Sequence, residues 1–486
     1  MSPYAVPQCH LHIGGQRLTH GSGGVHAHRF PATGEVQSEI PLAGVAEVDA
    51  AVQAAHEALR TWTKLGPAGR RDALTRLADL MARDTDELAR LSVLDNAMTF
   101  SFAQYAAGSA TEWTRYYAGF ADKVEGRVVS TPGQLRDLAY TVPEPYGVIG
   151  IIITWNGPLI SLGMKVIPAL AAGNTVVIKP SELTPYMVEH FLALVAEAGI
   201  PAGVVNLVPG GPAAGEALVR HRLVQKVSFT GGPATARKIL TACAADLKPA
   251  VVELGGKSAN LIFPDANLDA ALWLAVYTSL VTLAGQGCAM PTRLLVHDEV
   301  YDEVADRVTA AASAITLGDP FDPATESSPL VTAEAQQRVL GMIERAVSEG
   351  AGEVLTGGGV PEGLGEGYFV SPTVIGEVDP ASEIAQVEVF GPVLSLIRFS
   401  DEAQAIDIAN STSYGLAAYA WTNDLARVNR LTSRLRAGGV YVNGGQPVLA
   451  PELPFGGLGV SGYGREGGAE GLYEFVRTKA VSIARG

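Results

Sequence analysis

Hydrophobic residues recur at intervals of three and four along the first quarter of the chain. Segments 47–62 and 69–97 both show this spacing, and it continues to about Tyr117. Such a period gathers apolar side chains on one face of an α-helix, so we predict a helical region from about Val45 to Tyr117. The stretch 130–146 has turn residues and a short alternating run, which predicts a β-hairpin that leaves the main body.

After residue 147 the pattern changes to short apolar runs separated by amphipathic segments. The predicted strands are "GVIGIIIT", "NTVVIKP", "GVVNLVPG", "VQKVSFTGG" and "AVVELGG", and the segments between them are predicted helices. This alternation indicates right-handed βαβ units and a parallel sheet covered on both faces. A second α/β pattern runs from about 257 to 455, and the tail 474–486 is predicted as a strand that packs away from the body.

Length and composition narrow the class of protein. A chain of 486 residues exceeds one ordinary core, and 47% hydrophobic against 17% charged residues is typical of a well-buried α/β protein. The net charge of −15 argues against general binding to nucleic acids or anionic membranes, because no basic stripe is available to neutralise phosphates. The most apolar windows are short and broken by Gly, Asn and Pro, which suits a buried strand better than a membrane span.

Cysteine and histidine usage predicts no metal site and no disulfide framework. Cys9, Cys243 and Cys288 lie far apart and without metal-ligand spacing. The N-terminus shows no signal peptide, so a cytoplasmic protein is expected. Five histidines crowd the first 28 residues, and without Cys or carboxylate partners at ligand spacing we expect a flexible polar arm there.

Polar and glycine residues gather where the predicted parallel strands end. Ligands of such sheets bind beyond the carboxyl ends of the strands. The residues at these ends are Trp155, Asn156, Lys179, Pro180, Ser181, Glu182, Thr230, Gly231, Gly232, Glu253, Leu254, Gly255 and Gly256.

Cys288 lies in "LAGQGCAM", between a helix-like and a strand-like run. By composition alone, a buried structural cysteine is the favoured interpretation. Small neighbours, however, leave its backbone N–H accessible, and a thiolate nucleophile attacking a carbonyl needs such donors for the resulting oxyanion. Asn156 is a candidate second donor, although an Asn before Gly-Pro is also a common turn residue.

The other strand-end residues each allow two interpretations. Glu253 is either a cap or loop acceptor, or a desolvated carboxyl that accepts a proton from water. Lys179 and Glu182 form either a surface ion pair or a site for ribose hydroxyls. No GxGxxG follows any of these strands, and Gly231 with Gly232 before a helix is only a weak signal for pyrophosphate binding.

Together, these segments resemble the aldehyde dehydrogenase superfamily, from roughly residue 20 to the end. The matching motifs, in order, are "TWNGP", "IKPSE", "SFTGG", "ELGGKSANLIF", "GQGC", "EVFGPV", "VNGG" and "PFGGLGVSGYGRE". The resemblance implies a hydrolytic, non-acylating dehydrogenase with NAD as cofactor. It assigns Cys288 as nucleophile, Asn156 as oxyanion-hole side chain and Glu253 as general base. The implied cofactor-binding residues are Lys179, Glu182, Trp155, Gly231, Gly232, Glu388 and Phe390.

The resemblance also implies a domain organisation. A Rossmann-like NAD-binding domain would comprise 1–129 and 147–255, and a catalytic α/β domain 256–470. A small β oligomerisation element would comprise 130–146 and 471–486, and family members assemble through such an element as homodimers or homotetramers. The implied mechanism passes through a thiohemiacetal and a thioester on Cys288, which water activated by Glu253 hydrolyses to the acid.

Two departures from the family pattern bear on the substrate. Thr154 and Gly157 flank the Trp-Asn pair, where the family often has Pro and an aromatic residue. Since the residue after Asn lines the aldehyde tunnel in the family, Gly157 predicts room for bulky apolar or aromatic aldehydes, unless a neighbouring side chain fills the space. Met290, Phe455 and the segment 444–453 are the other expected pocket residues.

Glu182 also predicts a preference for NAD over NADP, because a carboxylate accepts ribose hydroxyls and repels a 2′-phosphate. Two alternative functions stay open. A CoA-acylating dehydrogenase would hand the thioester to a thiol, but those relatives commonly lack the base that Glu253 would provide. A non-catalytic family member would act as a binding protein, but such a protein should have lost Cys288 or Glu253.

Overall fold

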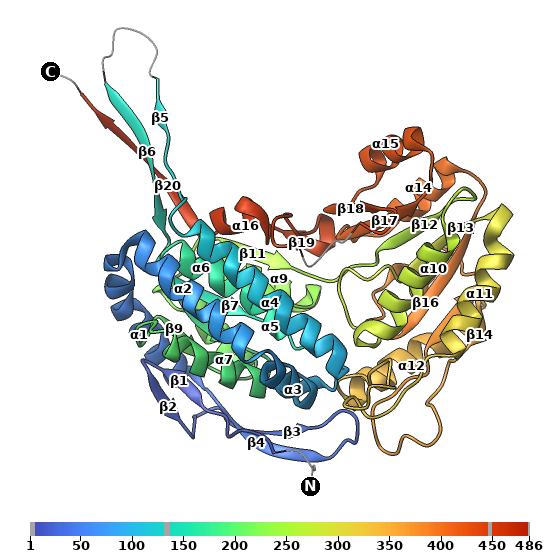
Figure 1. Ribbon diagram of the computed structural model, residues 1–486, viewed down its shortest axis with the longest axis horizontal. Helices are drawn as coiled ribbons and strands as arrows, with labels where there is room; N and C mark the ends of the chain where they lie inside the picture. The colour runs from blue at the N-terminus through green and yellow to red at the C-terminus, as the bar shows by residue number, and fades with distance from the viewer. Residues whose placement is uncertain (1–4, 131–136, 446–449, 485–486) are drawn as a thin grey trace.

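A computed structural model gives the fold and describes residues 5–130, 137–445 and 450–484. Two α/β bodies lie side by side, each built on its own sheet, and a narrow β extension rises from one of them (Figure 1). The fold is thus an α/β architecture with two sheet-centred bodies, as the alternation of apolar strands and amphipathic helices predicts.

The first sheet has the order β19-β11-β10-β7-β8-β9-β1-β2. Its parallel centre is formed by the five predicted strands: β7 (Val148–Ile152), β8 (Thr175–Lys179), β9 (Val205–Leu207), β10 (Val224–Thr230) and β11 (Ala250–Glu253). Antiparallel strands complete both edges: β1 (Leu11–Ile13), β2 (Gln16–Leu18) and β19 (Gly462–Tyr463). The strand β7 lies between β8 and β10, so β8 and β9 follow on one side of it and β10 and β11 on the other. Open parallel sheets bind ligands at such a switch point.

Helices cover both faces of this sheet because their apolar stripes pack on its buried strands. The helices are α1 (Val45–Lys64), α2 (Gly66–Arg83), α3 (Thr85–Asn96), α4 (Phe100–Phe120), α5 (Pro158–Ser161), α6 (Ile167–Ala171), α7 (Tyr186–Glu197), α8 (Pro212–Arg220) and α9 (Pro233–Ala245). The predicted helical region from Val45 to Tyr117 is confirmed. Trp62 and Trp113 are fully buried in the core that results.

The second sheet has the order β14-β15-β16-β13-β12-β17-β18 and is parallel except for β14. Its strands are β12 (Ala259–Ile262), β13 (Arg293–His297), β14 (Glu353–Thr356), β15 (Thr373–Gly376), β16 (Val393–Phe399), β17 (Ala417–Trp421) and β18 (Gly439–Val442). Its helices are α10 (Leu268–Val276), α11 (Tyr301–Ser313), α12 (Ala333–Ser348), α13 (Glu383–Gln386), α14 (Glu402–Asn410) and α15 (Leu425–Arg434).

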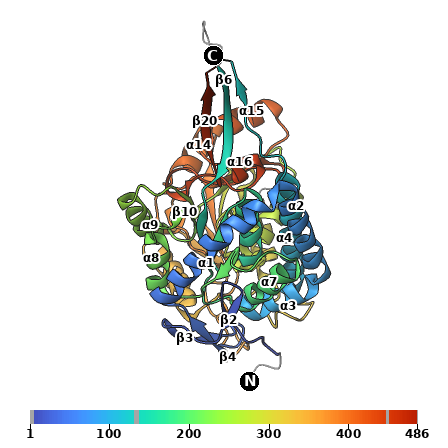
Figure 2. The same cartoon turned by 90° about the vertical axis from the view of Figure 1, so that its left-hand side faces the viewer.

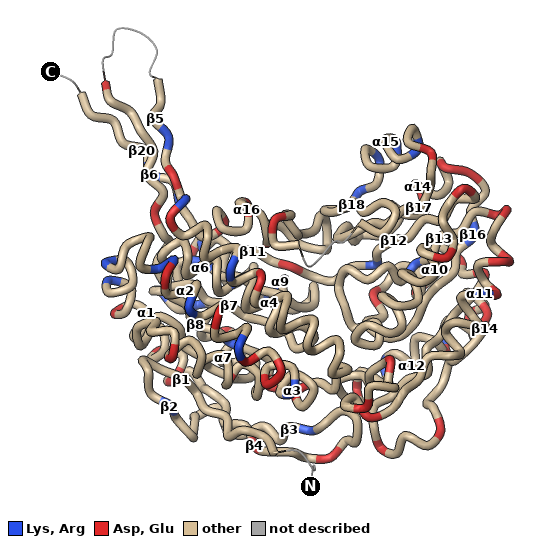
Figure 3. Tube along the Cα trace, in the orientation of Figure 1, with Lys and Arg blue, Asp and Glu red and all other residues tan. Residues whose placement is uncertain are grey.

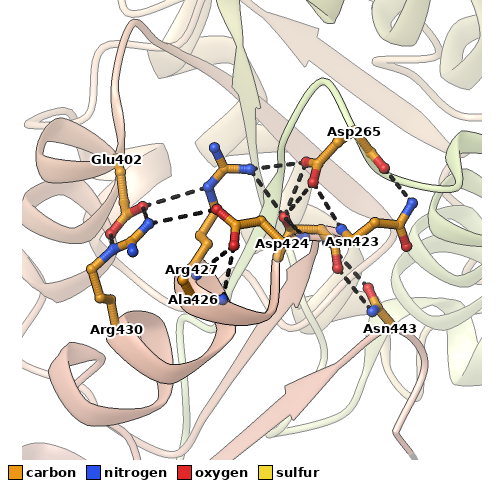
Figure 4. A network of polar contacts seen from close by, with 9 residues as sticks. Asp265, Glu402, Asn423, Asp424, Ala426, Arg427, Arg430 and Asn443 are labelled. Carbon is orange, nitrogen blue, oxygen red and sulfur yellow. Dashed lines mark hydrogen bonds and ion pairs between the residues drawn. The ribbon is translucent and has the colours of Figure 1, made fainter.

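A polar network fixes the loops at the carboxyl ends of β12 and β17 (Figure 4). Asp265 accepts hydrogen bonds from the Thr422 hydroxyl at 2.8 Å and from the Asn423 backbone N–H at 2.9 Å. Arg427 of α15 lies 2.9 Å from Asp265 and 3.5 Å from Glu402 of α14. The network therefore ties two helices of the second body to its central strands.

The β extension consists of β5 (Val128–Val129), β6 (Leu138–Pro145) and β20 (Val476–Ile483), in the order β20-β6-β5. It stands away from the body in both views, and α16 (Gly468–Tyr473) leads into it (Figure 2). Of the hairpin predicted over 130–146, β6 lies within the stretch and pairs with β5 just before it, while residues 131–136 lie outside the described residues. The domain boundaries stay a prediction, and β19, from the predicted catalytic segment, joins the first sheet.

The expectation of a flexible N-terminal arm is wrong for the described residues. His12 lies in β1, which begins directly after His10, while His26 and His28 lie in β3 (Gly24–Arg29), which pairs with β4 (Val36–Leu42). His10 and His28 are buried, because each finds a polar partner far along the chain: Glu189 for His10, and the Leu183 carbonyl for His28. Those partners could not be recognised from local spacing.

Lysines and arginines alternate with aspartates and glutamates along much of the described chain trace (Figure 3). By length and composition, one helical run among the described residues could cross a membrane: Leu268–Gly285, with a mean hydropathy of 1.5. This run consists of α10 followed by a π-helical turn and a 3₁₀ turn. Of the residues in the run, 44% are buried inside the protein.

Candidate active site

The structure gathers the predicted strand-end residues at one edge of the first sheet. Trp155 and Asn156 follow β7, Lys179 ends β8, Gly232 caps α9 after β10, and Glu253 ends β11. In the sheet register, Ile152 of β7 pairs with Lys179, and Thr230 of β10 pairs with Glu253. The switch point of the sheet therefore carries these polar groups side by side.

Cys288 faces this edge from an unusual loop of the second body. Leu283, Ala284 and Gly285 all have left-handed backbone conformations, with φ of 50°, 50° and 71°. A Cβ at Gly285 would come within 2.2 Å of the Gly391 carbonyl, so only glycine fits there. The loop brings Cys288 out of the core as the one partly exposed cysteine of the three.

The buried Gln286 side chain holds this loop in place. It donates to the carbonyls of Leu283 at 2.8 Å and Pro329 at 3.2 Å, and it accepts from the Val331 N–H at 3.0 Å. Tyr419 of β17 anchors the other side by donating to the Ala289 carbonyl at 2.8 Å. The thiol is therefore positioned by residues fixed on both sides of it, a requirement for precise attack on a substrate.

Asn156 reaches across from the first body to the same loop. Its amide Nδ2 donates to the Gln286 carbonyl at 2.9 Å, two residues before Cys288. An Asn amide has two hydrogens, so one remains for a substrate oxygen. The Trp155 carbonyl accepts from Asn96 at 2.9 Å, which fixes the turn. The Cys288 backbone N–H, which interacts with its own sulfur, is a second donor at this place.

Glu253 is buried, and neither of its carboxyl oxygens has a hydrogen-bond partner among the described residues. Burial raises its pKa well above the ordinary value, and the negative charge of Glu466 adds to this, against the cations Lys165 and Arg465. A Cβ at Gly456 would lie 2.7 Å from Glu253 Oε1, so the backbone approaches the carboxyl more closely there than a side chain would allow. An unpartnered carboxyl of raised pKa is suited to accept a proton from water.

Sequence reasoning missed the buried ion pair of Lys165 and Glu466 next to this carboxyl. Both side chains are almost inaccessible, and Lys165 also donates to the Ser228 hydroxyl at 3.2 Å. The available signals were a lysine inside an otherwise apolar helical run and the glutamate of "GRE". These groups set the charge around Glu253.

The surroundings of Cys288 favour the neutral thiol over the thiolate. Desolvation of the sulfur, together with the carboxyls of Glu388, Glu253 and Glu466, raises the pKa of Cys288 to about 12. A Cβ at Gly256 would lie 2.4 Å from the Cys288 carbonyl oxygen, so the strand end that carries Glu253 abuts the thiol loop. Attack by sulfur therefore requires that its proton pass to a nearby base.

Residues from both bodies form the wall of the predicted cofactor site. The rings of Trp155 and Phe390 meet edge to face with centroids 5.5 Å apart, and Phe390 has a left-handed φ of 51°. Glu388 lies against Gly255 and accepts from the Gly256 N–H at 2.9 Å. Burial raises the pKa of Glu388 to about 7, although the Gly256 N–H and two cations oppose this.

Lys179 and Glu182 lie together on the other side of the switch point. The Lys179 ammonium donates to the Pro180 carbonyl at 3.0 Å and is 3.9 Å from Glu182. Gly211 and Gly232 cap α8 and α9, and both have open space where a Cβ would stand. The exposed N–H groups of two helix starts are typical of phosphate sites, so these residues fit a dinucleotide.

The predicted pocket residues Gly157, Met290 and Phe455 have different surroundings. A Cβ at Gly157 would meet no atom within 4 Å, so no neighbouring side chain fills that space. Met290 folds back over Gly287, where a Cβ would lie 2.5 Å from its terminal methyl. Phe455 is buried in the core cluster against which Cys288 packs, and four residues of the segment 444–453 lie outside the described residues.

Comparison with known proteins places this geometry in a family. The model of the "Aldehyde dehydrogenase family" matches residues 20–481. A mitochondrial aldehyde dehydrogenase from Homo sapiens is 40% identical over 459 residues, which cover 93% of this chain and 87% of that protein.

Solved structures support the same family assignment. PnpE from Pseudomonas sp. WBC-3, also solved in complex with nicotinamide adenine dinucleotide, superposes with a TM-score of 0.95 at 40% identity over 98% of both chains. Betaine aldehyde dehydrogenase from Staphylococcus aureus in complex with NAD+ has a TM-score of 0.95 at 32% identity, over 99% of this chain and 95% of that one.

Proposed function

Because this chain belongs to the aldehyde dehydrogenase family, we propose that it oxidises an aldehyde to the carboxylic acid with NAD as cofactor. The observation that carries the proposal is the meeting of three groups from separate elements. Cys288 lies on its anchored loop, Asn156 touches that loop, and the unpartnered Glu253 carboxyl belongs to the strand end that abuts it. Formation of reduced cofactor with a simple aldehyde is the first test.

The dinucleotide fits the residues at the switch point. Lys179 and Glu182 would hold the adenosine ribose, and the helix starts at Gly211 and Gly232 would hold the pyrophosphate. Glu388 would bind the second ribose between the two bodies. When bound, the dinucleotide supplies the hydride acceptor that converts a tetrahedral adduct on Cys288 into a thioester.

In the proposed first step, the Cys288 sulfur attacks the aldehyde carbon as its proton passes to the Glu388 carboxylate, whose charge acts on the thiol more strongly than that of Glu253. Asn156 Nδ2 and the Cys288 N–H donate to the oxygen that gains negative charge. Because the turn of Asn156 is already fixed through Asn96, these donors need little rearrangement.

In the proposed second step, Glu253 removes a proton from water, which attacks the thioester and releases the acid and the Cys288 thiol. Burial keeps the carboxyl protonated at low pH, so this step requires a pH high enough to ionise it.

Two other functions remain testable. Transfer of the acyl group to CoA would need no water-activating base, and the unpartnered Glu253 favours hydrolysis. A purely binding role would leave no reason to anchor a partly exposed thiol next to an amide donor. We also propose a homodimer or homotetramer assembled through the β extension, since β20 and β5 present unpaired strand edges.

The open space at Gly157 supports a bulky apolar or aromatic aldehyde as substrate. The Gly157→Phe variant is expected to lose about tenfold or more in kcat/KM for an aromatic aldehyde, while a two-carbon aldehyde is oxidised within about twofold of wild type. Its φ of −151° lies outside the left-handed region that favours glycine. Gly359→Phe, at another open glycine, is the control. Equal losses for large and small aldehydes would refute the assignment.

Glu182 supports NAD over NADP, because its carboxylate would face the 2′-position of the ribose. Wild type is expected to favour NAD over NADP by about tenfold or more in kcat/KM. Glu182→Gln should reduce this NAD/NADP ratio by about tenfold, because it removes the repulsion between the carboxylate and the 2′-phosphate. Glu197→Gln, which removes an exposed carboxylate on α7, should leave the ratio unchanged. Equal wild-type rates with both cofactors at low concentration would contradict this preference.

A further inference from the structure

A cluster of side chains of metal-ligand type lies at β1, next to the edge strand β2 of the first sheet. His10 immediately precedes β1 and His12 lies within it, so both point to the same side while Leu11 between them is buried in the core. Glu189, on α7, lies between the two rings. None of these residues takes part in the proposed dehydrogenase chemistry.

The three side chains converge closely. Glu189 Oε1 is 2.9 Å from His10 Nδ1, and Glu189 Oε2 is 2.8 Å from His12 Nε2. One ligand atom from each residue lies within 4.8 Å of the others. The side chains are only 10%, 13% and 7% exposed, in the order His10, His12, Glu189, so the surrounding fold determines their positions.

Arg17 shows that this cluster attracts a cation. Its Nη2 lies 2.8 Å from Glu189 Oε1 and 3.1 Å from His10 Nδ1. The Glu189 carboxylate accepts from the Arg17 guanidinium, which also lies within reach of the His10 ring. The carboxylate thus already holds one positive charge at the cluster. Because the Arg17 side chain is 59% exposed, it can swing into solvent.

A surface pocket opens directly onto the cluster and would admit water as a further ligand. Its lining residues are Pro7, Gln8, His10, Arg17, Glu87, Leu91, Glu189, His190 and Ala193. Among its charged groups, Glu87 pairs with Arg90 at 2.7 Å and His190 pairs with Asp84 at 2.9 Å. Arg17 is therefore the cation in direct competition for the Glu189 carboxylate.

We propose that His10, His12 and Glu189 form a binding site for a divalent transition metal of the zinc class. Two imidazoles and one carboxylate, with water in the remaining position, are a ligand set that Zn²⁺ accepts. Binding displaces Arg17 and links β1 to α7. The two ligands on these elements, His12 and Glu189, are 177 residues apart in the sequence. No catalytic role is assigned to the metal.

The test is a titration of the full-length protein, freed of metal by a chelator, with Zn²⁺ by calorimetry and with Co²⁺ by absorption. We expect one equivalent bound at this site, with a Co²⁺ spectrum of nitrogen and oxygen ligands. A thiolate charge-transfer band would instead report metal at Cys288. His12→Gln and Glu189→Gln should each weaken Zn²⁺ binding by about tenfold or more. His20→Gln, at an exposed histidine outside the cluster, is the matched control.

Arg17→Ala separates the metal site from a purely structural ion cluster. Removal of the competing cation should raise Zn²⁺ affinity by about tenfold. Because Arg17 is exposed, this variant keeps the test valid even if the buried substitutions prevent folding. The proposal is overturned if wild type binds no more Zn²⁺ than the His12→Gln variant, if Arg17→Ala leaves affinity unchanged or lowers it, or if Co²⁺ binds only through a thiolate.

Discussion

The Cys288→Ala variant is expected to lose aldehyde oxidation by at least about 10³-fold in kcat, because no other group can form the covalent adduct. Alanine removes only the sulfur from a partly exposed position, so the fold should be retained. Steady-state formation of reduced cofactor at saturating aldehyde measures the effect. The variant should still bind the dinucleotide, since the predicted cofactor residues lie on other elements.

Cys243→Ala is the control for this experiment. Cys243 is buried on α9, away from the strand-end residues, and its substitution should leave kcat close to that of wild type. If Cys288→Ala kept wild-type turnover, or if both variants lost activity equally, the thiol would not be the nucleophile.

The Glu253→Gln variant is expected to separate the two chemical steps. Glutamine has nearly the same shape but cannot accept a proton, so thioester formation should survive while hydrolysis slows by about 10²-fold or more. Stopped-flow measurement should then show a burst of one reduced cofactor per active site followed by very slow turnover. Addition of CoA should not restore turnover if the enzyme is hydrolytic.

The pH dependence follows from the raised pKa of Glu253, which burial and the charge of Glu466 produce. Its active form is the carboxylate, so the hydrolytic rate should be low in acid and rise as pH passes through this raised pKa. Glu253→Gln should abolish that rise. Glu197→Gln, an exposed carboxylate on α7, should leave it unchanged. A hydrolytic rate independent of pH in wild type would contradict the assignment.

The succession of strands and helices could be predicted from sequence because each apolar period is local. The strand ends carried the further signal: Asn156 and Glu253 follow apolar runs, and parallel strands bring such ends to one edge. The conformation of the Cys288 loop could not be predicted. Leu283 and Ala284 are non-glycine residues in left-handed conformations, and the loop is held by contacts of Gln286 with residues more than 40 positions away.

The features that the sequence did not predict depend on contacts between residues that are distant in sequence. Lys165 and Glu466 lie 301 residues apart, so nothing local shows that they pair beside the predicted base. The N-terminal histidines were expected in a flexible arm for the same reason, since Glu189, the carboxylate that contacts them, belongs to α7. In both cases a charged residue inside an apolar helical run, Lys165 or Glu189, was the visible sign of a buried partner.

The central claim, a thioester on Cys288 that Glu253 helps to hydrolyse, is tested most directly by rapid quenching of the Glu253→Gln variant after one turnover with NAD and an aldehyde. Mass spectrometry of the quenched protein should find one acyl group per chain on the peptide containing Cys288, formed together with one equivalent of reduced cofactor. Reduced cofactor without any acyl group on that peptide, or an acyl group on another residue, would contradict the claim.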